Sequence, residues 1–223
     1  HRNFEMFWFP YARIVQQRWA DETRDPPAHP LSPRAIRSRF YDRALTSAAR
    51  HLAQGSSQAA ERAGALLAAR IRHRSAVLEA EDAYHLARRT RVLQLEYAIP
   101  IERVAETLRL LERLIRALDF RIHVPIEVRF VRADDAWLSP QYQRDSACIT
   151  LPAYSDRPHG DYFAAISELF DRVDGRPHWA TAHGKTDVEL RRLYPRFDEF
   201  CRIRAQLDPR GLFLNPYLGR LFG

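Results

Sequence analysis

Residues 91–118 read RVLQLEYAIPIERVAETLRLLERLIRAL, and they contain the clearest strand and helix patterns of the chain. Its first part is apolar and β-favouring up to Ile99 and stops at Pro100, which predicts a strand over residues 91–99. Beyond Pro100 the apolar residues recur at helical spacing, which predicts an amphipathic helix over residues 101–118. The residues that form its apolar face are Val104, Leu108, Leu111, Leu114, Ile115 and Leu118.

The sequence downstream continues the alternation of strands and helices. Strands are predicted over residues 125–132 and 147–151, a helix over residues 161–173, and a short strand over residues 176–179. Together with residues 91–118 this order is β-α-β-β-α-β, the split βαβ arrangement. The predicted fold class is therefore α+β: an antiparallel, ferredoxin-like sheet with helices on one side. A last helix is predicted over residues 196–207, before Asp208 and Pro209.

The N-terminal part of the chain differs in composition. Residues 4–11, FEMFWFPY, predict a strand that is buried on both faces. Four prolines between residues 25 and 33 indicate a linker or surface loop. The residues that follow are rich in Ala, Arg, Leu and Gln, which predicts a helical insertion over residues 34–90.

Composition excludes several classes of protein. The 223 residues include 35 Lys+Arg and 28 Asp+Glu, and Lys185 is the one lysine among the basic residues. The arginines are spread along the chain and interleaved with acids, which argues against a basic nucleic-acid-binding domain. No apolar run approaches the ~20 residues of a membrane span. Cys148 and Cys201 are predicted to stay unpaired in a reducing compartment, so we expect a cytoplasmic protein, with association with a membrane left open.

Two groups of residues could carry chemistry. Glu127 and Arg129 alternate with apolar residues on a predicted strand, so they share a face, as either a solvated ion pair or a pair that lines a polar pocket. Residues 176–183, RPHWATAH, place His178 and His183 around Trp179, as either a packed edge or a source of a general base. No Gly-rich phosphate loop and no metal-ligand spacing occurs.

Several blocks of sequence resemble a known family. They are residues 4–11 (FEMFWFPY), 95–100 (LEYAIP), 133–140 (ADDAWLSP), 176–179 (RPHW), 193–195 (LYP) and 208–218 (DPRGLFLNPYL). These blocks resemble the sugar-1,4-lactone oxidases, including D-arabinono-1,4-lactone oxidase, and the alditol oxidases, which are FAD-linked flavoproteins of the vanillyl-alcohol oxidase superfamily. The resemblance implies that residues 1–223 are the C-terminal substrate (cap) domain, and that an N-terminal FAD-binding domain belongs to another part of the protein.

The resemblance also implies an activity. The full-length protein is expected to oxidise a CH–OH group of a sugar-1,4-lactone of the D-arabinono- or L-gulono- type, passing a hydride to FAD and then electrons to O₂ or another acceptor. Oxidation of a polyol, as in the alditol oxidases, is the alternative within the family, and a non-catalytic interaction module or a nucleic-acid-binding domain are the alternatives outside it. The present chain alone is expected to be inactive, and its partners are its own FAD-binding domain and a small lactone or polyol.

Site residues follow from the same resemblance. Glu127 and Arg129 match the family's Glu-x-Arg pair at the flavin, so Glu127 is expected to bind substrate hydroxyls and Arg129 to stabilise negative charge and contact the cofactor. Glu96 and Trp179 are expected to bind substrate. In the tail, residues 193–223, Asn215 and Tyr217 match a motif that returns toward the flavin domain. They are therefore expected to bind the cofactor, or else they only cap the tail against the core.

The chain departs from the family pattern at two positions. Thr181 stands where family members commonly carry a lysine, and Lys185 does not align with that position. Either the lysine is dispensable, or His178 or His183 takes over substrate binding and proton transfer as a catalytic residue. Thr150 stands near the place of a pocket histidine, and both threonines are expected to bind substrate.

Overall fold

The computed structural model describes residues 2–11, 13–26, 92–120, 125–154 and 159–223, together with residues 56, 58, 59, 61, 62, 65 and 77. The helical insertion predicted over residues 34–90, and part of the linker before it, therefore lie almost entirely outside the described residues. Residues 58, 59, 61, 62 and 65 are helical. No helix among the described residues is long and apolar enough to cross a membrane.

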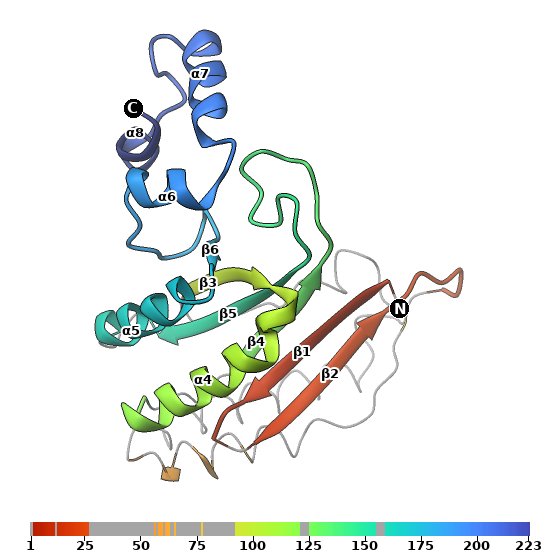
Figure 1. Cartoon of the computed structure of the whole chain (residues 1–223). Coiled ribbons are helices and arrows are strands. Elements are labelled where there is room, and N and C mark those ends of the chain that lie inside the picture. The colour runs from red at the N-terminus through yellow and green to blue at the C-terminus, as the bar shows by residue number, and fades with distance from the viewer. Residues whose placement is uncertain are drawn as a thin grey trace. The chain divides into compact units, whose positions relative to one another are not determined.

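The described part of the chain combines a sheet with helices (Figure 1). Its strands are β1 (Asn3–Phe9), β2 (Ile14–Ala20), β3 (Val92–Pro100), β4 (Ile126–Val131), β5 (Ser146–Tyr154) and β6 (Arg176–Pro177). A single 3-10 turn, η1 (Ile101–Arg103), leads into α4 (Val104–Ala117), and the later helices are α5 (Gly160–Asp171), α6 (Asp187–Leu193), α7 (Phe197–Leu207) and α8 (Pro216–Phe222).

The order of the strands confirms the predicted α+β class. The strand order in the sheet is β2-β1-β4-β5-β3-β6. β3 therefore lies between β5 and β6, although it precedes β4, β5 and β6 in the chain. β6 is antiparallel to β3, and β1 is antiparallel to both β2 and β4. The segment β3-α4-β4-β5-α5-β6 is thus a split βαβ unit, to which β1 and β2 are added beside β4.

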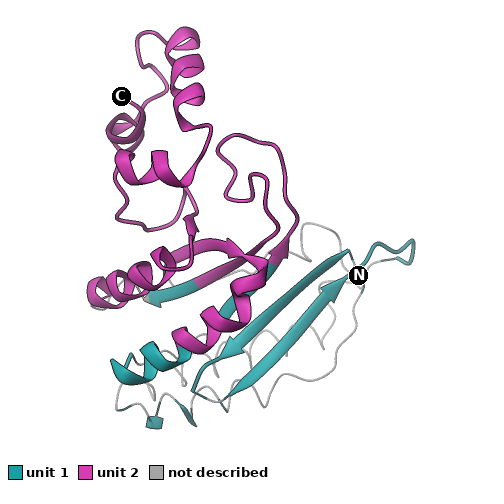
Figure 2. Cartoon of the chain, in the orientation of Figure 1, with its two compact units in different colours: residues 1–93, 112–129, 151–158 teal, residues 94–111, 130–150, 159–223 magenta. Residues whose placement is uncertain are grey.

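The chain divides into two compact units (Figure 2). Unit 1 comprises residues 1–93, 112–129 and 151–158, and unit 2 comprises residues 94–111, 130–150 and 159–223. The hairpin of β1 and β2 belongs to unit 1, whereas β3 after Leu93, the loop after β6 and the three C-terminal helices belong to unit 2.

In unit 1, β1 differs from its prediction. Phe7 and Phe9 are buried, but the alternate residues Phe4, Met6 and Trp8 are only half-buried, so the prediction of a strand buried on both faces is wrong. The reason is the hairpin partner β2, which the sequence analysis missed. Its residues Val15 and Trp19 lie opposite Trp8 and Phe4 and are 50% and 46% exposed, so they extend this face without covering it.

The turn of the hairpin is held to the end of α4. The Tyr11 hydroxyl donates a hydrogen bond to the Phe120 carbonyl at 2.7 Å, and the Arg116 guanidinium donates to the Pro10 carbonyl at 3.1 Å while it lies over the Tyr11 ring. Within α4 itself Leu111 and Ile115 are fully buried, as the helical spacing predicts. Leu118 follows the last turn of the helix and is half exposed, because the regular spacing ends at Ala117.

In unit 2, the C-terminal helices have a hydrophobic cluster of their own. Its buried members are Leu190, Tyr194, Phe197, Leu221 and Phe222, and Trp179 packs against them. α7 was predicted within one residue, whereas α6 and α8 were missed. Both are seven-residue helices that begin at a side-chain cap: Thr186 caps α6 and Asn215 caps α8. The predicted strand over residues 176–179 is only two residues long, and the rest forms the loop that carries Trp179.

The tight turn after α5 gives a test of the fold. A Cβ atom on Gly175 would lie 2.9 Å from the Phe170 carbonyl oxygen and 3.1 Å from the Tyr97 ring, so nothing larger than glycine fits without a shift of backbone. We expect Gly175→Ala to lower the free energy of unfolding by about 1–3 kcal/mol. Urea denaturation checks this, with Gly160→Ala as the matched control because a Cβ there meets nothing within 4 Å. Equal stability of the two variants would contradict the packing described.

Candidate functional site

In unit 1 the predicted pair on β4 lies as its spacing indicates. Glu127 and Arg129 project from one face of the strand, with 3.4 Å between Arg129 Nε and Glu127 Oε1. Ile126 and Val128, on the other face, are fully buried. The Glu127 side chain is 15% exposed and the Arg129 side chain 42%, so the carboxylate is largely covered while the guanidinium reaches solvent. An exposed cation beside a covered carboxylate can bind a polar ligand by both charges.

The neighbouring strands extend this pair into a row of alternating charges. Glu5 on β1 lies directly opposite Arg129, and Arg18 on β2 lies directly opposite Glu5. Arg18 Nε forms an ion pair with Glu5 Oε1, and its guanidinium lies 5.6 Å from the centre of the Phe7 ring. Directly opposed side chains on one face are close enough to interact. Glu5 and Arg18 are not among the site residues predicted from the sequence, although Glu5 alternates with apolar residues on β1 and so could be assigned to one face of that strand.

In unit 2 the predicted substrate residues Glu96 and Thr150 meet. The Thr150 hydroxyl donates a hydrogen bond to Glu96 Oε2 at 2.7 Å, and both residues are buried. A buried carboxylate needs hydrogen-bond donors to offset the loss of water, and Thr150 supplies one. The two residues lie on β5 and β3 and are 54 residues apart in the chain, so spacing alone could not pair them.

The loop after β6 is fastened to β3 by three hydrogen bonds. The His178 amide donates to the Glu96 carbonyl at 2.9 Å, the Ala182 amide donates to the Gln94 carbonyl at 2.8 Å, and the Glu96 amide donates to Thr181 Oγ1 at 3.3 Å. The Thr181 hydroxyl in turn donates to the His178 carbonyl at 3.1 Å. Thr181 therefore contacts the backbone of β3 and the backbone of the loop itself.

The two candidate histidines have different surroundings. His178 is half-buried, and its Nδ1 accepts a hydrogen bond from the Ala180 amide at 3.2 Å, so the neutral ring carries its proton on Nε2. His183 Nε2 lies 2.6 Å from the Tyr217 hydroxyl, and its Nδ1 is buried with no hydrogen-bond partner among the described residues. Burial, together with the positive charge of Lys185, lowers the pKa of His183, so this ring is neutral at physiological pH.

Trp179 is fixed by the C-terminal helices and by the loop before β5. Its indole Nε1 donates to the Leu138 carbonyl at 2.7 Å, and its ring packs against the rings of Tyr194 and Phe222. The Tyr217 hydroxyl contacts the Trp179 carbonyl at 3.2 Å. Trp179 as a whole residue is half-buried.

The tail residues have local partners in this structure. Asn215 Oδ1 accepts a hydrogen bond from the Leu218 amide at 2.8 Å, which makes Asn215 the N-cap of α8. Tyr217 ties α8 to Trp179 and His183. These contacts are those expected from the capping interpretation of the two residues.

A metal ion has no cluster of ligands among the described residues, because nowhere do three or more His, Cys, Asp or Glu side chains come together there. Cys148 and Cys201 are both free, which confirms the prediction that they are unpaired.

Comparison with known proteins gives a consistent family. A sequence model of D-arabinono-1,4-lactone oxidase matches residues 1–221. The chain is 32% identical over 222 residues to the L-gulono-1,4-lactone dehydrogenase of Mycobacterium tuberculosis, which covers 99% of this chain and 52% of that protein.

Two further relatives match a smaller share. The L-gulonolactone oxidase of Bos taurus is 43% identical over 132 residues, covering 57% of this chain and 30% of that protein. The alditol oxidase of a Streptomyces species is 32% identical over 127 residues, covering 56% and 30% respectively. The chain thus spans about half the length of the Mycobacterium protein, and the parts of it that match the other two cover less than a third of those proteins.

The lowered pKa of His183 predicts a pH-dependent loss of stability. As the pH falls through about 6.5, the ordinary histidine value, the unfolded chain gains a proton that the folded chain resists, so the folded state becomes less stable. His183→Gln keeps a polar group for Tyr217 and cannot be protonated. We expect the free energy of unfolding of the wild type, relative to His183→Gln, to decrease between about pH 7.5 and pH 5.5. Urea denaturation across this range checks it, and a difference that does not vary with pH would contradict it.

Proposed function

Because the chain belongs to the D-arabinono-1,4-lactone oxidase family, we propose that it supplies the substrate-binding part of an FAD-dependent oxidoreductase. The reaction is the oxidation of a CH–OH group of a sugar 1,4-lactone. The observation that carries this proposal is the match of the family model along residues 1–221. The names of the Mycobacterium and Bos relatives, a dehydrogenase and an oxidase of an L-gulono-lactone, support a lactone as the substrate class.

A polyol is the second candidate substrate, because the Streptomyces relative is named an alditol oxidase. The lactone is the stronger candidate on two grounds. The family model is that of a lactone oxidase, and the lactone-named relatives match either with higher identity or over nearly the whole chain. Both candidates offer vicinal hydroxyl groups, so the same carboxylates can serve either one.

Glu127 and Arg129 are proposed as the catalytic pair. The Glu127 carboxylate accepts hydrogen bonds from substrate hydroxyls, and its partial burial strengthens them because less water competes. Arg129 presents planar donors of fixed positive charge, which stabilise negative charge as it builds up. An exposed guanidinium fits the anionic edge of a flavin, and FAD, when bound, would accept the hydride lost by the carbinol carbon.

Glu96, Thr150, Thr181 and Trp179 are proposed to bind substrate. The Thr150 hydroxyl holds Glu96 in one orientation, and the bonds between β3 and the loop hold Thr181 at the same strand. Trp179 is half-buried, and an aromatic side chain of this kind can pack against the apolar face of a sugar ring. Since Thr181 is engaged with the backbone, it serves this proposal better by fixing the loop than by replacing a lysine.

The histidines are proposed in different roles. His178 carries its proton on Nε2, so it suits donation of a hydrogen bond to a substrate oxygen. His183 has one nitrogen occupied by Tyr217 and the other buried, so its geometry supports a role behind the binding residues, holding the loop to α8. The carboxylates then remain as candidates for accepting the hydroxyl proton.

The C-terminal tail, residues 193–223, is proposed to contact the part of the longer protein that binds FAD. The turn between α7 and α8 carries Leu207, Leu212 and Phe213, which are 82%, 68% and 84% exposed. The turn is ordered by Asp208, whose carboxylate accepts hydrogen bonds from the amides of Leu212 and Phe213. An apolar surface held in a fixed shape is suited to an interface. The present chain alone is then inactive, because its cofactor is held elsewhere.

Flavin reduction by candidate substrates tests the proposed function. The protein is purified at its full natural length, and its visible absorption is recorded without oxygen before and after addition of L-gulono-1,4-lactone or a sugar alcohol. We expect a flavin spectrum that is bleached by the lactone faster than by the sugar alcohol. Faster bleaching by the sugar alcohol would favour the alditol candidate, and a protein without flavin would contradict both.

Substitution of Arg129 tests the catalytic pair in that same protein. Arg129→Ala removes a preorganised cation, so we expect turnover to fall ~100-fold. Arg129→Lys keeps the charge without the planar donors, so we expect its turnover to lie between that of the wild type and that of Arg129→Ala. Arg132→Ala is the control, because Arg132 is an exposed arginine just beyond the same strand. If Arg129→Ala turned over as fast as the Arg132→Ala control, the role of Arg129 would be structural.

A further inference from the structure

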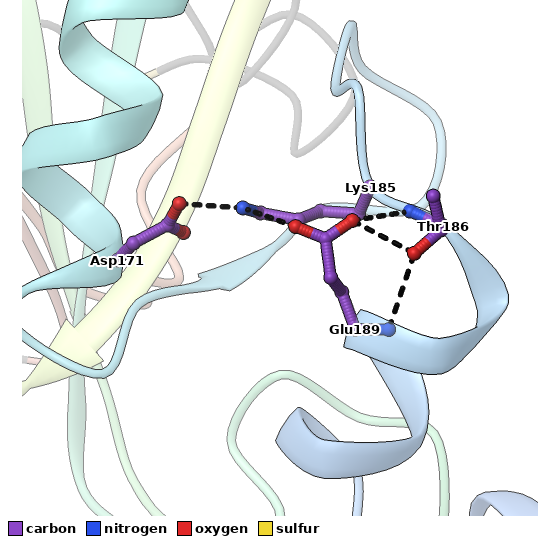
Figure 3. Close-up of polar contacts among 4 residues, drawn as sticks. All are labelled: Asp171, Lys185, Thr186 and Glu189. Carbon is purple, nitrogen blue, oxygen red and sulfur yellow. Dashed lines mark hydrogen bonds and ion pairs between the residues drawn. The ribbon is translucent and has the colours of Figure 1, made fainter.

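Lys185 is the one lysine among 35 basic residues, and its surroundings are unusual for a lysine. Its side chain is only 8% exposed. Long charged side chains are rarely buried to this degree unless they are paired. Figure 3 shows the ammonium group between two carboxylates that come from different helices.

The contacts of Lys185 join the end of α5 to the start of α6. Its Nζ lies 2.6 Å from Asp171 Oδ2, at the last residue of α5, and 3.2 Å from Glu189 Oε1 in α6. Glu189 uses its other oxygen, Oε2, to accept hydrogen bonds from the amide and the hydroxyl of Thr186, each at 2.8 Å. The Thr186 hydroxyl oxygen accepts from the Glu189 amide at 3.3 Å, which completes a capping box.

The pKa values of Lys185 and Glu189 keep both side chains charged. Burial lowers the pKa of Lys185, but the hydrogen bond with Asp171 and the other nearby groups outweigh it, and the pKa lies above its ordinary value. The hydrogen bond from the Thr186 backbone lowers the pKa of Glu189. Both groups are therefore charged throughout the physiological range.

Lys185 lies in the half of the loop after β6 whose backbone is not hydrogen-bonded to β3 in the described part of the chain. The first half of that loop is held to β3 through His178, Thr181 and Ala182. Among the described residues, no backbone hydrogen bond joins β3 to the loop beyond Ala182. The second half of the loop is therefore held by the contacts of Lys185 and by the hydrogen bond between His183 and Tyr217.

We infer that Lys185 is a positioning residue, which holds the second half of the loop after β6 against α5 and α6. It thereby fixes His183 and supports, from the far end of the same loop, the first half that carries Trp179 and Thr181. It acts through the loop and touches no substrate. A compact ammonium fits between two carboxylates, whereas a planar guanidinium requires a wider arrangement, which accounts for a lysine at this one position of an arginine-rich chain. The consequence for substrate binding rests on the proposed function; the clasp itself does not.

Amide hydrogen exchange of the full chain tests the clasp. Lys185→Met removes the ammonium and leaves two carboxylates unpaired, so we expect the amides of Thr181, Ala182 and Glu189 to exchange roughly 10- to 100-fold faster, with no change in α4. Arg192→Met is the matched control, because it removes one positive charge from an exposed position of the same helix, α6. Equal exchange in the two variants would overturn the proposal.

The titration of His183 gives a second measurement that a general loss of stability would not move. The groups that act on this ring are Lys185, Glu189, His178 and Tyr217. Followed by NMR, the pKa of His183 should rise in Lys185→Met and stay low in Lys185→Arg, which keeps the charge. An unchanged pKa in Lys185→Met would show that the two side chains are not held together, against the proposal.

Kinetics of the full-length flavin-containing protein separate this inference from the proposed function. We expect Lys185→Met to raise KM for the lactone by a larger factor than it lowers kcat, because binding residues shift while the catalytic pair on β4 is untouched. Equal effects on both constants, or none, would overturn the positioning role. If the wild type oxidised no lactone, the proposed function would fail, while the exchange and titration experiments would still decide the clasp.

Discussion

A carboxylate buried inside a sheet is the constraint on which unit 2 depends. Glu96 lies on β3 among the fully buried residues Leu95, Tyr97 and Ile99, where an unpaired charge would be costly. Thr150 donates to its carboxylate, and the backbone groups of Glu96 bind His178 and Thr181. One residue thus joins β5, β3 and the loop after β6, so Glu96 helps to position Thr150, His178 and Thr181.

Arginine and lysine occupy different kinds of site in this protein. Guanidinium groups lie over aromatic rings at several places, including Arg116 over Tyr11, Arg191 over Phe197 and Arg196 over Trp137. These contacts use the flat, weakly hydrated face of arginine, which lysine lacks. Lysine occurs only where a small cation must fit between two carboxylates. Part of the arginine-rich composition therefore serves internal packing in the described part of the chain.

Sequence patterns predicted the elements that carry their own periodicity and missed those that depend on a partner. Residues 91–118 gave a strand and a helix close to their true bounds, because their buried faces repeat regularly. β2 has no such pattern and becomes a strand by pairing with β1. α6 and α8 are too short for a clear helical repeat, and the sequence signals that could have located their starts were the Thr186–Glu189 capping box and the Asn215–Pro216 step. For the site, spacing placed Glu127 and Arg129 on one face, but the pairing of Glu96 with Thr150 and of Lys185 with Asp171 joins distant residues and needed the fold.

The row of alternating charges across β2, β1 and β4 also fixes the alignment of these strands. A slip of β1 by two residues, the smallest shift that keeps each face in place, would bring Glu5 opposite Glu127 and set two acids against each other. Apolar pairs such as Met6 with Val128 discriminate much less between the two alignments. The charged residues proposed for chemistry therefore also set the register of the strands in the sheet. Their substitution is constrained by correct strand pairing as well as by catalysis.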